Sequence, residues 1–135
     1  MKKTVIRGPV PKSGMWIVTD IRRIGVSARY SDFVILGDTA YFSGYVPETT
    51  LGQSVAAQTR DILAQIDQSL AEVGSDKTRI VQATIWLAEI GSYDEMNAVW
   101  DSWVIPRQAP ARICVESRLA DPGYALEIRV IAALS

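Results

Sequence analysis

Alternating hydrophobic and polar positions mark several short strands in the first part of the chain. Two runs rich in β-branched and aromatic residues, 33–36 and 39–43, flank the turn dipeptide Gly37-Asp38, and this order predicts a hairpin. Residues 15–26 and 79–89 carry similar runs and are expected to form strands as well.

The hydrophobic period then lengthens to that of a helix. Apolar side chains recur at three- and four-residue steps between Val55 and Val73, so a helix is expected over about residues 53–73. Thr50 and Gln53 have the spacing of a capping box before it, and Gly74 stands where helices commonly end. This helix is the strongest local prediction.

A second, shorter helical segment follows the strand at 79–89. Ser92 and Glu95 again have capping-box spacing, and an apolar stripe behind them ends at Pro106. The stripe consists of Met96, Val99, Trp100 and Trp103. Trp100 and Trp103 therefore fit core or interface packing better than a cofactor site.

Two alternating apolar-rich segments, 111–119 and 124–134, close the chain. Turn chemistry at 120–123 predicts that they pair as an antiparallel hairpin. The order of elements predicts an α+β fold, mainly an antiparallel sheet with two helices on one face. By strand parity the other face carries apolar side chains, which favours an oligomer because a monomer would expose them. Among them are Val34, Leu36, Ile131 and Ala133.

Composition narrows the classes of function. A length of 135 residues with 48% hydrophobic content suits one domain, here expected as an arm with first strands over 1–28 and a main domain over 29–135. Lys and Arg total 14 against 15 Asp and Glu, so nucleic acid is a poor partner. Without histidine and with the single Cys114, the usual metal sites are not available. No signal peptide or membrane span is recognised, and we expect a cytoplasmic protein without metal or cofactor.

Candidate chemistry gathers on the last two predicted strands. Alternation places Arg112, Cys114 and Glu116 on one face, expected to point away from the helices, and the predicted hairpin brings Glu127 near Arg112. An arginine and a glutamate on adjacent strands ordinarily form a cross-strand ion pair. Cys114 is ordinarily a small apolar residue, because nothing near it in the sequence would lower its pKa.

The stretch Pro110-Ala111-Arg112-Ile113-Cys114-Val115-Glu116, followed by Ala-Leu-Glu-Ile-Arg-Val-Ile-Ala-Ala at 125–133, resembles the C-terminal region of the RidA/YjgF family of reactive-intermediate deaminases. The resemblance spans about residues 29 to 134. It continues upstream through Leu36-Gly37-Asp38, Ser43-Gly44, Val46-Pro47 and Met96-Asn97-Ala98.

This resemblance implies a chorismate-mutase-like fold, a homotrimer, and an active site in each cleft between neighbouring subunits. Arg112 matches the arginine that binds the substrate carboxylate, for which a planar guanidinium is well shaped. Glu127 matches the glutamate that positions the attacking water, with the Cys114 backbone nearby. Further pocket positions are matched by Tyr30, Ser43 and Asn97.

The implied reaction is hydrolysis of a small 2-imino or enamine acid to a 2-oxo acid and ammonia, without a cofactor. It depends mainly on holding the substrate and one water in place. The chain departs from the family pattern at Ala28-Arg29, where Gly-Pro commonly precedes the tyrosine, and at Arg129, which replaces a second glutamate. These departures indicate a divergent subgroup, while retention of Arg112 and Glu127 favours activity.

Three other functions compete with this one. A non-catalytic module would hold a small carboxylate metabolite in the same cleft through Arg112. A chorismate mutase would call for several converging cations, and Arg112 is the well-placed one. A ribonuclease gains little support from a balanced charge and the lack of histidine.

Overall fold

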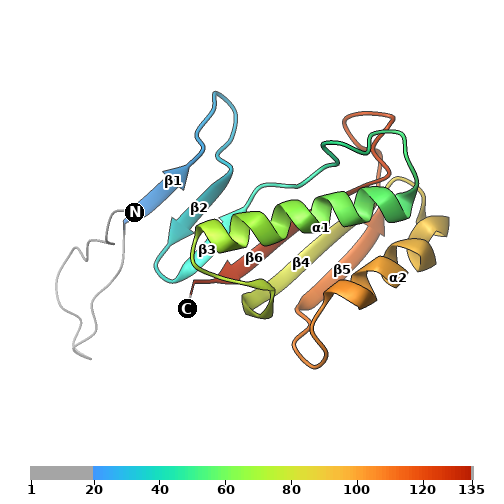
Figure 1. Ribbon diagram of the computed structural model, residues 1–135. Coiled ribbons are helices and arrows are strands. Elements are labelled where there is room, and N and C mark those ends of the chain that lie inside the picture. Colours follow the sequence, from blue (N-terminus) through green and yellow to red (C-terminus); the bar gives the residue numbers. More distant parts are fainter. Residues whose placement is uncertain (1–19, 135) are drawn as a thin grey trace.

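The computed structural model describes residues 20–134, which form a six-stranded mixed sheet with two helices packed over one face (Figure 1). The strands lie in the order β1-β2-β3-β6-β4-β5. They are β1 (Ile21–Ile24), β2 (Phe33–Leu36), β3 (Thr39–Phe42), β4 (Ile80–Leu87), β5 (Ala111–Glu116) and β6 (Leu126–Ala133). The helices are α1 (Val55–Glu72) and α2 (Tyr93–Trp103), with short 3-10 turns η1 (Lys77–Arg79) and η2 (Ile90–Ser92).

The predicted first hairpin is confirmed. β2 pairs antiparallel with β3, with Phe33 opposite Phe42, and Gly37 turns the chain with a φ of 61° that L side chains rarely adopt. β1 pairs antiparallel with β2, inside the strand expected over 15–26. Residues 1–19 of the expected N-terminal arm lie outside the described residues.

Helix α1 confirms the predicted segment, but its N-terminus is capped by another residue than expected. Ser54 is the N-cap, and its side chain accepts a hydrogen bond from the Ala57 amide. The Thr50 hydroxyl instead donates to the Asp61 carboxylate, so the predicted capping box is wrong. At the other end Gly74 adopts a φ of 75°, as expected for a helix stop.

The capping box predicted for α2 is also wrong, for a reason that concerns helix packing. Ser92 occupies the N-cap position, but its hydroxyl donates to the Glu89 carbonyl. The Glu95 carboxylate accepts a hydrogen bond at 2.8 Å from the Ala56 amide in the first turn of α1. A negative charge is favourable at a helix N-terminus, so this contact ties the two helices together.

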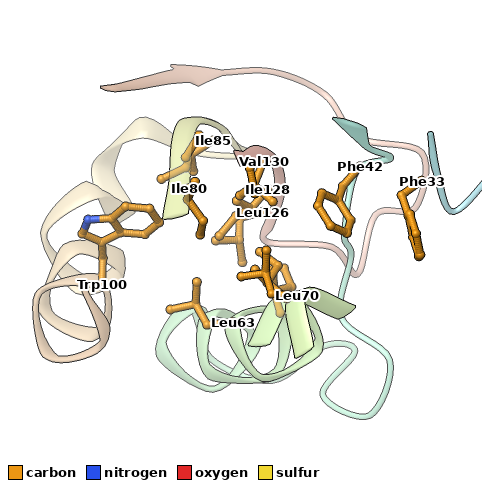
Figure 2. Packing of buried hydrophobic residues seen from close by; sticks show 14 of the residues in the cluster. Phe33, Phe42, Leu63, Leu70, Ile80, Ile85, Trp100, Leu126, Ile128 and Val130 are labelled. Atoms are coloured by element: carbon orange, nitrogen blue, oxygen red, sulfur yellow. The ribbon is translucent and has the colours of Figure 1, made fainter. Parts of the chain in front are cut away.

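The hydrophobic core lies between the sheet and the helices. Figure 2 shows Leu63 of α1 and Trp100 of α2 directed toward the strand residues around Leu126 and Ile128. Leu126 and Ile128 are fully buried, and Trp100 is 4% exposed, which confirms the packing role predicted for this indole. Burial of each such side chain contributes about 1.5–3 kcal/mol, so this layer holds the sheet and the helices together.

The predicted hairpin of the last two strands is wrong, because β4 lies between them. β4 pairs antiparallel with β6 on one side and parallel with β5 on the other. Helix α2 connects β4 to β5, and a strand–helix–strand crossover returns the chain in the same direction, which makes the two strands parallel. The sheet is therefore mixed, and β5 forms one of its edges.

The face of the sheet opposite the helices, here called the outer face, is rich in apolar side chains, as predicted. The register places Val34, Leu36, Ile131 and Ala133 on it. Exposed large residues on the same face are Ile21, Leu36, Tyr41, Ile113 and Val115. Within residues 20–134, no helix is long and apolar enough to cross a membrane.

Candidate functional site

The register of β5 turns Arg112 toward the helices, which corrects the prediction that it points away from them. Arg112 lies opposite Ala83 of β4, which is fully buried under the helices, and Cys114 lies opposite Ile85, which is also fully buried. The exposed large hydrophobic side chains of β5 are Ile113 and Val115, on the outer face. The apolar set of this strand is therefore outside and the polar set inside.

Helix α2 fixes the guanidinium of Arg112. Nη1 donates to Asn97 Oδ1 at 2.8 Å, and Nη2 donates to the Tyr93 hydroxyl at 3.1 Å. The guanidinium carbon also lies 5.2 Å from the centre of the Trp100 ring. Tyr93, Asn97 and Trp100 follow one another at helical spacing, so one face of α2 presents all three.

These contacts hold the cation without neutralising it. Tyr93 and Asn97 are neutral acceptors, and among residues 20–134 no carboxylate forms an ion pair with Arg112. Because β5 is an edge strand of the sheet, no further strand from residues 20–134 covers Arg112 on that side. An oriented and partly buried guanidinium of this kind is suited to bind the carboxylate of a ligand.

Glu127 lies on the other face of the sheet. It stands opposite Trp86 in β4, and its carboxylate makes no hydrogen bond or ion pair within the described part of the chain. Since β4 separates β5 from β6, Glu127 and Arg112 neither adjoin nor pair, which overturns the expected proximity and the ion-pair interpretation. Burial raises the pKa of Glu127 above its ordinary value, so its ionised form is less stable than in water.

Gly44, two residues after the end of β3, leaves the space that the Glu127 carboxylate occupies. A Cβ at Gly44 would stand 2.0 Å from Glu127 Oε2, closer than any real contact allows. Gly44 and Ser43 also line a hollow of about 370 Å³ beside α1. The Ser43 hydroxyl donates to the Ser31 carbonyl oxygen at 2.6 Å, which holds the chain at this point.

Tyr30 borders the same hollow at the tip of the loop between β1 and β2. The Ser27 hydroxyl accepts from the Tyr30 amide, and the Ser27 amide donates to the Tyr30 carbonyl, so a tight turn presents the ring. The side chain is 61% exposed. The predicted residues therefore lie in three places: Arg112, Asn97 and Cys114 at α2, Tyr30 and Ser43 at the hollow beside α1, and Glu127 on the outer face next to Gly44.

Cys114 lies beside the arginine without the environment of a nucleophile. Burial raises the pKa of its thiol, and the nearby charge of Arg112 lowers it by less, so the thiol stays protonated near neutral pH. Over residues 20–134, no group of three or more histidine, cysteine or acidic side chains is placed to hold a metal ion.

Two residues of these groups were missed by sequence reasoning. Tyr93 precedes Asn97 by one helical turn, so once Asn97 is a candidate, helical spacing is the signal that would find it. Gly44 was part of the family resemblance, but its role depends on a contact with a distant strand that no local pattern shows.

Comparison with known proteins agrees with this fold over its whole length. Residues 20–134 match a family model described as endoribonuclease L-PSP. The crystal structure of NMB1025 from Neisseria meningitidis, a member of the YjgF family, superposes with a TM-score of 0.81 at 48% identity and covers 84% of this chain and 94% of that one. The chain belongs to the RidA/YjgF family. The family resemblance found in the sequence is thereby confirmed.

Relatives within the family carry names of different detail. A RutC family protein of Haemophilus ducreyi is 44% identical over 85% of this chain and 97% of its own length. The RutC family protein YoaB of Escherichia coli is also 44% identical, over 84% of this chain and 98% of its own. The human 2-iminobutanoate/2-iminopropanoate deaminase is 25% identical over 86% of this chain and 88% of its own.

Proposed function

We propose that this chain hydrolyses small 2-imino acids, or the enamines from which they form, to 2-oxo acids and ammonia. The observation that carries the proposal is the guanidinium of Arg112, which two neutral side chains orient and no carboxylate within residues 20–134 neutralises. The name of the human relative, 2-iminobutanoate/2-iminopropanoate deaminase, supports this substrate class, since such substrates carry one carboxylate.

The proposed site is a cleft between subunits of a homotrimer. Arg112 and Glu127 lie on opposite faces of the sheet, so one chain supplies the cation to one cleft and the carboxylate to another. The apolar outer face, with Ile113 at 55% exposure, is a surface that assembly would bury. Both observations favour association over a monomer.

In this cleft the substrate carboxylate binds Arg112 of one subunit, which fixes the position of the imine carbon. Glu127 of the neighbouring subunit accepts a proton from a water molecule as its oxygen attacks that carbon. The imine nitrogen, already protonated, takes up the electron pair of the C=N bond. Glu127 then passes the proton taken from water to the nitrogen, and as the C–N bond breaks and ammonia leaves, the new hydroxyl gives its proton to the Glu127 carboxylate and becomes the carbonyl of the 2-oxo acid.

A second candidate is a binding module without catalysis, in which Arg112 holds a small carboxylate metabolite. The same oriented guanidinium favours it, because binding needs the cation and not Glu127. Ribonuclease activity, which the description of the family model suggests, gains little from a net charge of −1. Turnover of an imine distinguishes hydrolysis from binding alone.

Subunit mixing tests the hydrolase and its cleft together. The substrate is generated in place by an amino-acid oxidase, and Arg112→Ala and Glu127→Gln are each expected to be nearly inactive. Trimers reassembled from an equal mixture of the two variants should recover roughly a quarter of the parent activity. A cleft is intact only when the subunit that supplies Arg112 is the Glu127→Gln variant and the subunit that supplies Glu127 is the Arg112→Ala variant. No recovery in mixed trimers would place both groups in one chain's own site, and an inactive parent would leave only the binding module.

A further inference from the structure

The hydroxyl of Tyr93 has a donor hydrogen that no acceptor within residues 20–134 receives. It accepts a bond at 3.1 Å from Nη2 of Arg112, which occupies a lone pair of the phenol oxygen. A phenol also carries one donor hydrogen, and within residues 20–134 no acceptor receives it. The side chain is 38% exposed, so this donor is accessible from outside the chain.

The contact with Arg112 makes this hydroxyl a better donor. A phenol that accepts a hydrogen bond from a cation is polarised, and its own O–H then donates more strongly. The ring is held as well, because its centre lies 5.8 Å from the guanidinium carbon. The donor therefore stands next to the cation in a fixed position, within reach of any carboxylate that binds there.

We propose that Tyr93 is a substrate-binding residue that donates a hydrogen bond to the substrate carboxylate beside Arg112. This inference rests on the proposed carboxylate site. One carboxylate oxygen accepts from the guanidinium, and the other accepts from the Tyr93 hydroxyl. The guanidinium and the phenol hydroxyl are both donors, so each needs an acceptor oxygen. A free carboxylate supplies both oxygens, and the site is therefore selective for it.

Tyr93→Phe tests the proposal, because it removes the hydroxyl and keeps the ring next to Arg112. The probe is 2-oxobutanoate, a 2-oxo acid that needs no turnover to bind. We expect its dissociation constant to rise roughly tenfold and the KM for the imine to rise similarly, with kcat little changed. Tyr124→Phe, in the loop before β6 and without a hydrogen bond to Arg112, is the matched control and should bind like the parent.

A second pair of variants separates direct contact from an effect through the arginine. Arg112→Lys keeps the charge and removes the planar fork. If Tyr93 contacts the carboxylate, Tyr93→Phe weakens binding in the Arg112→Lys background too, and if it only orients the guanidinium the loss disappears there and the proposal is wrong. A parent that binds 2-oxobutanoate without hydrolysing imines overturns the hydrolase alone, and a parent that does not bind it overturns both.

Discussion

The two charged groups of the candidate site are held by their own chain in opposite ways. Arg112 is fixed by hydrogen bonds from its guanidinium to Asn97 and Tyr93, and no carboxylate within residues 20–134 pairs with it. Glu127 accepts no hydrogen bond within residues 20–134, and the missing side chain of Gly44 is what leaves it room. The chain therefore orients the cation with its own side chains, whereas residues 20–134 leave the carboxylate without a partner.

The largest effect is expected from removing the prepared cation. Charge-assisted hydrogen bonds are worth on the order of 1.5–3 kcal/mol each, so loss of two in Arg112→Ala should lower kcat/KM by roughly two to four powers of ten. Arg112→Lys should also be severely impaired, because it keeps the charge but loses the fork. Light scattering must show that both variants assemble like the parent. An Arg112→Ala protein that hydrolyses imines as fast as the parent would place the site elsewhere.

The next largest effect is expected from changing Glu127, the carboxylate without a partner. Glu127→Gln preserves the shape of the side chain and removes its ability to accept a proton, so turnover should fall about a hundredfold. Binding of 2-oxobutanoate, measured by calorimetry, should stay near that of the parent, since the proposed carboxylate site is at Arg112. Unchanged turnover would limit Glu127 to a structural role.

A smaller effect is expected from moving Glu127 without changing it. A Cβ at Gly44 would meet Glu127 Oε2 at 2.0 Å, so Gly44→Ala must displace the carboxylate. A displacement of about an ångström costs roughly ten- to a hundredfold in turnover. Gly91→Ala is the control, because its Cβ would meet nothing within 4 Å. Equal loss in both variants, or none in Gly44→Ala, would contradict the role assigned to this glycine.

The parts of the fold that depend on neighbours along the chain could be predicted from the sequence. The hairpin of β2 and β3 and the extent of α1 follow from hydrophobic period and turn residues. The last two strands were paired wrongly because succession along the chain does not make strands adjacent in a sheet. The order β4-α2-β5 contains the missing information, since such a crossover joins parallel strands.

The orientation of Arg112 could not be predicted for a different reason. Apolar residues normally point into the core, but in β5 the apolar Ile113 and Val115 are exposed and Arg112 faces α2. This rule fails here because the outer face is itself apolar, so hydrophobic side chains of the strand occur on both faces and do not indicate which one faces the helices. Family resemblance supplied the identity of Arg112 and Glu127, and the structure showed that they lie on opposite faces.

Cys114 is expected to contribute little to turnover, in contrast to Arg112 and Glu127. Burial raises the pKa of its thiol more than the charge of Arg112 lowers it, so almost no thiolate exists at neutral pH. Water is the nucleophile in the proposed reaction, and Cys114→Ser should keep most of the turnover in the oxidase-coupled assay. Complete loss in a variant that folds and assembles like the parent would show that the thiol takes part in the chemistry.

The smallest effect concerns stability. It measures how much the ionised, unpartnered carboxylate of Glu127 lowers the free energy of unfolding. Burial raises the folded-state pKa of Glu127 above its ordinary value of 4.5, so the contribution of its protonated form is complete below that pH and is lost as the pH rises through the raised pKa. Glu127→Gln has no proton to lose. It should therefore match the parent at acid pH and gain roughly 1–3 °C in melting temperature at neutral pH, a small shift because the carboxylate is partly solvated.

Thermal unfolding of parent and variant across this pH range provides the measurement, with the difference between the two as the readout. The pKa of Asp61 is lowered by hydrogen bonds from the 48–50 segment and Gln65, although burial acts in the opposite direction. The stability that Asp61 contributes is therefore lost toward acid pH in both proteins, and it cancels in the difference between them. A Glu127→Gln protein less stable than the parent at neutral pH would mean that the assembled protein gives this carboxylate a stabilising partner. Glu127 would then be fixed by its neighbour much as Arg112 is fixed by α2, and the contrast between the two groups would belong to the single chain alone.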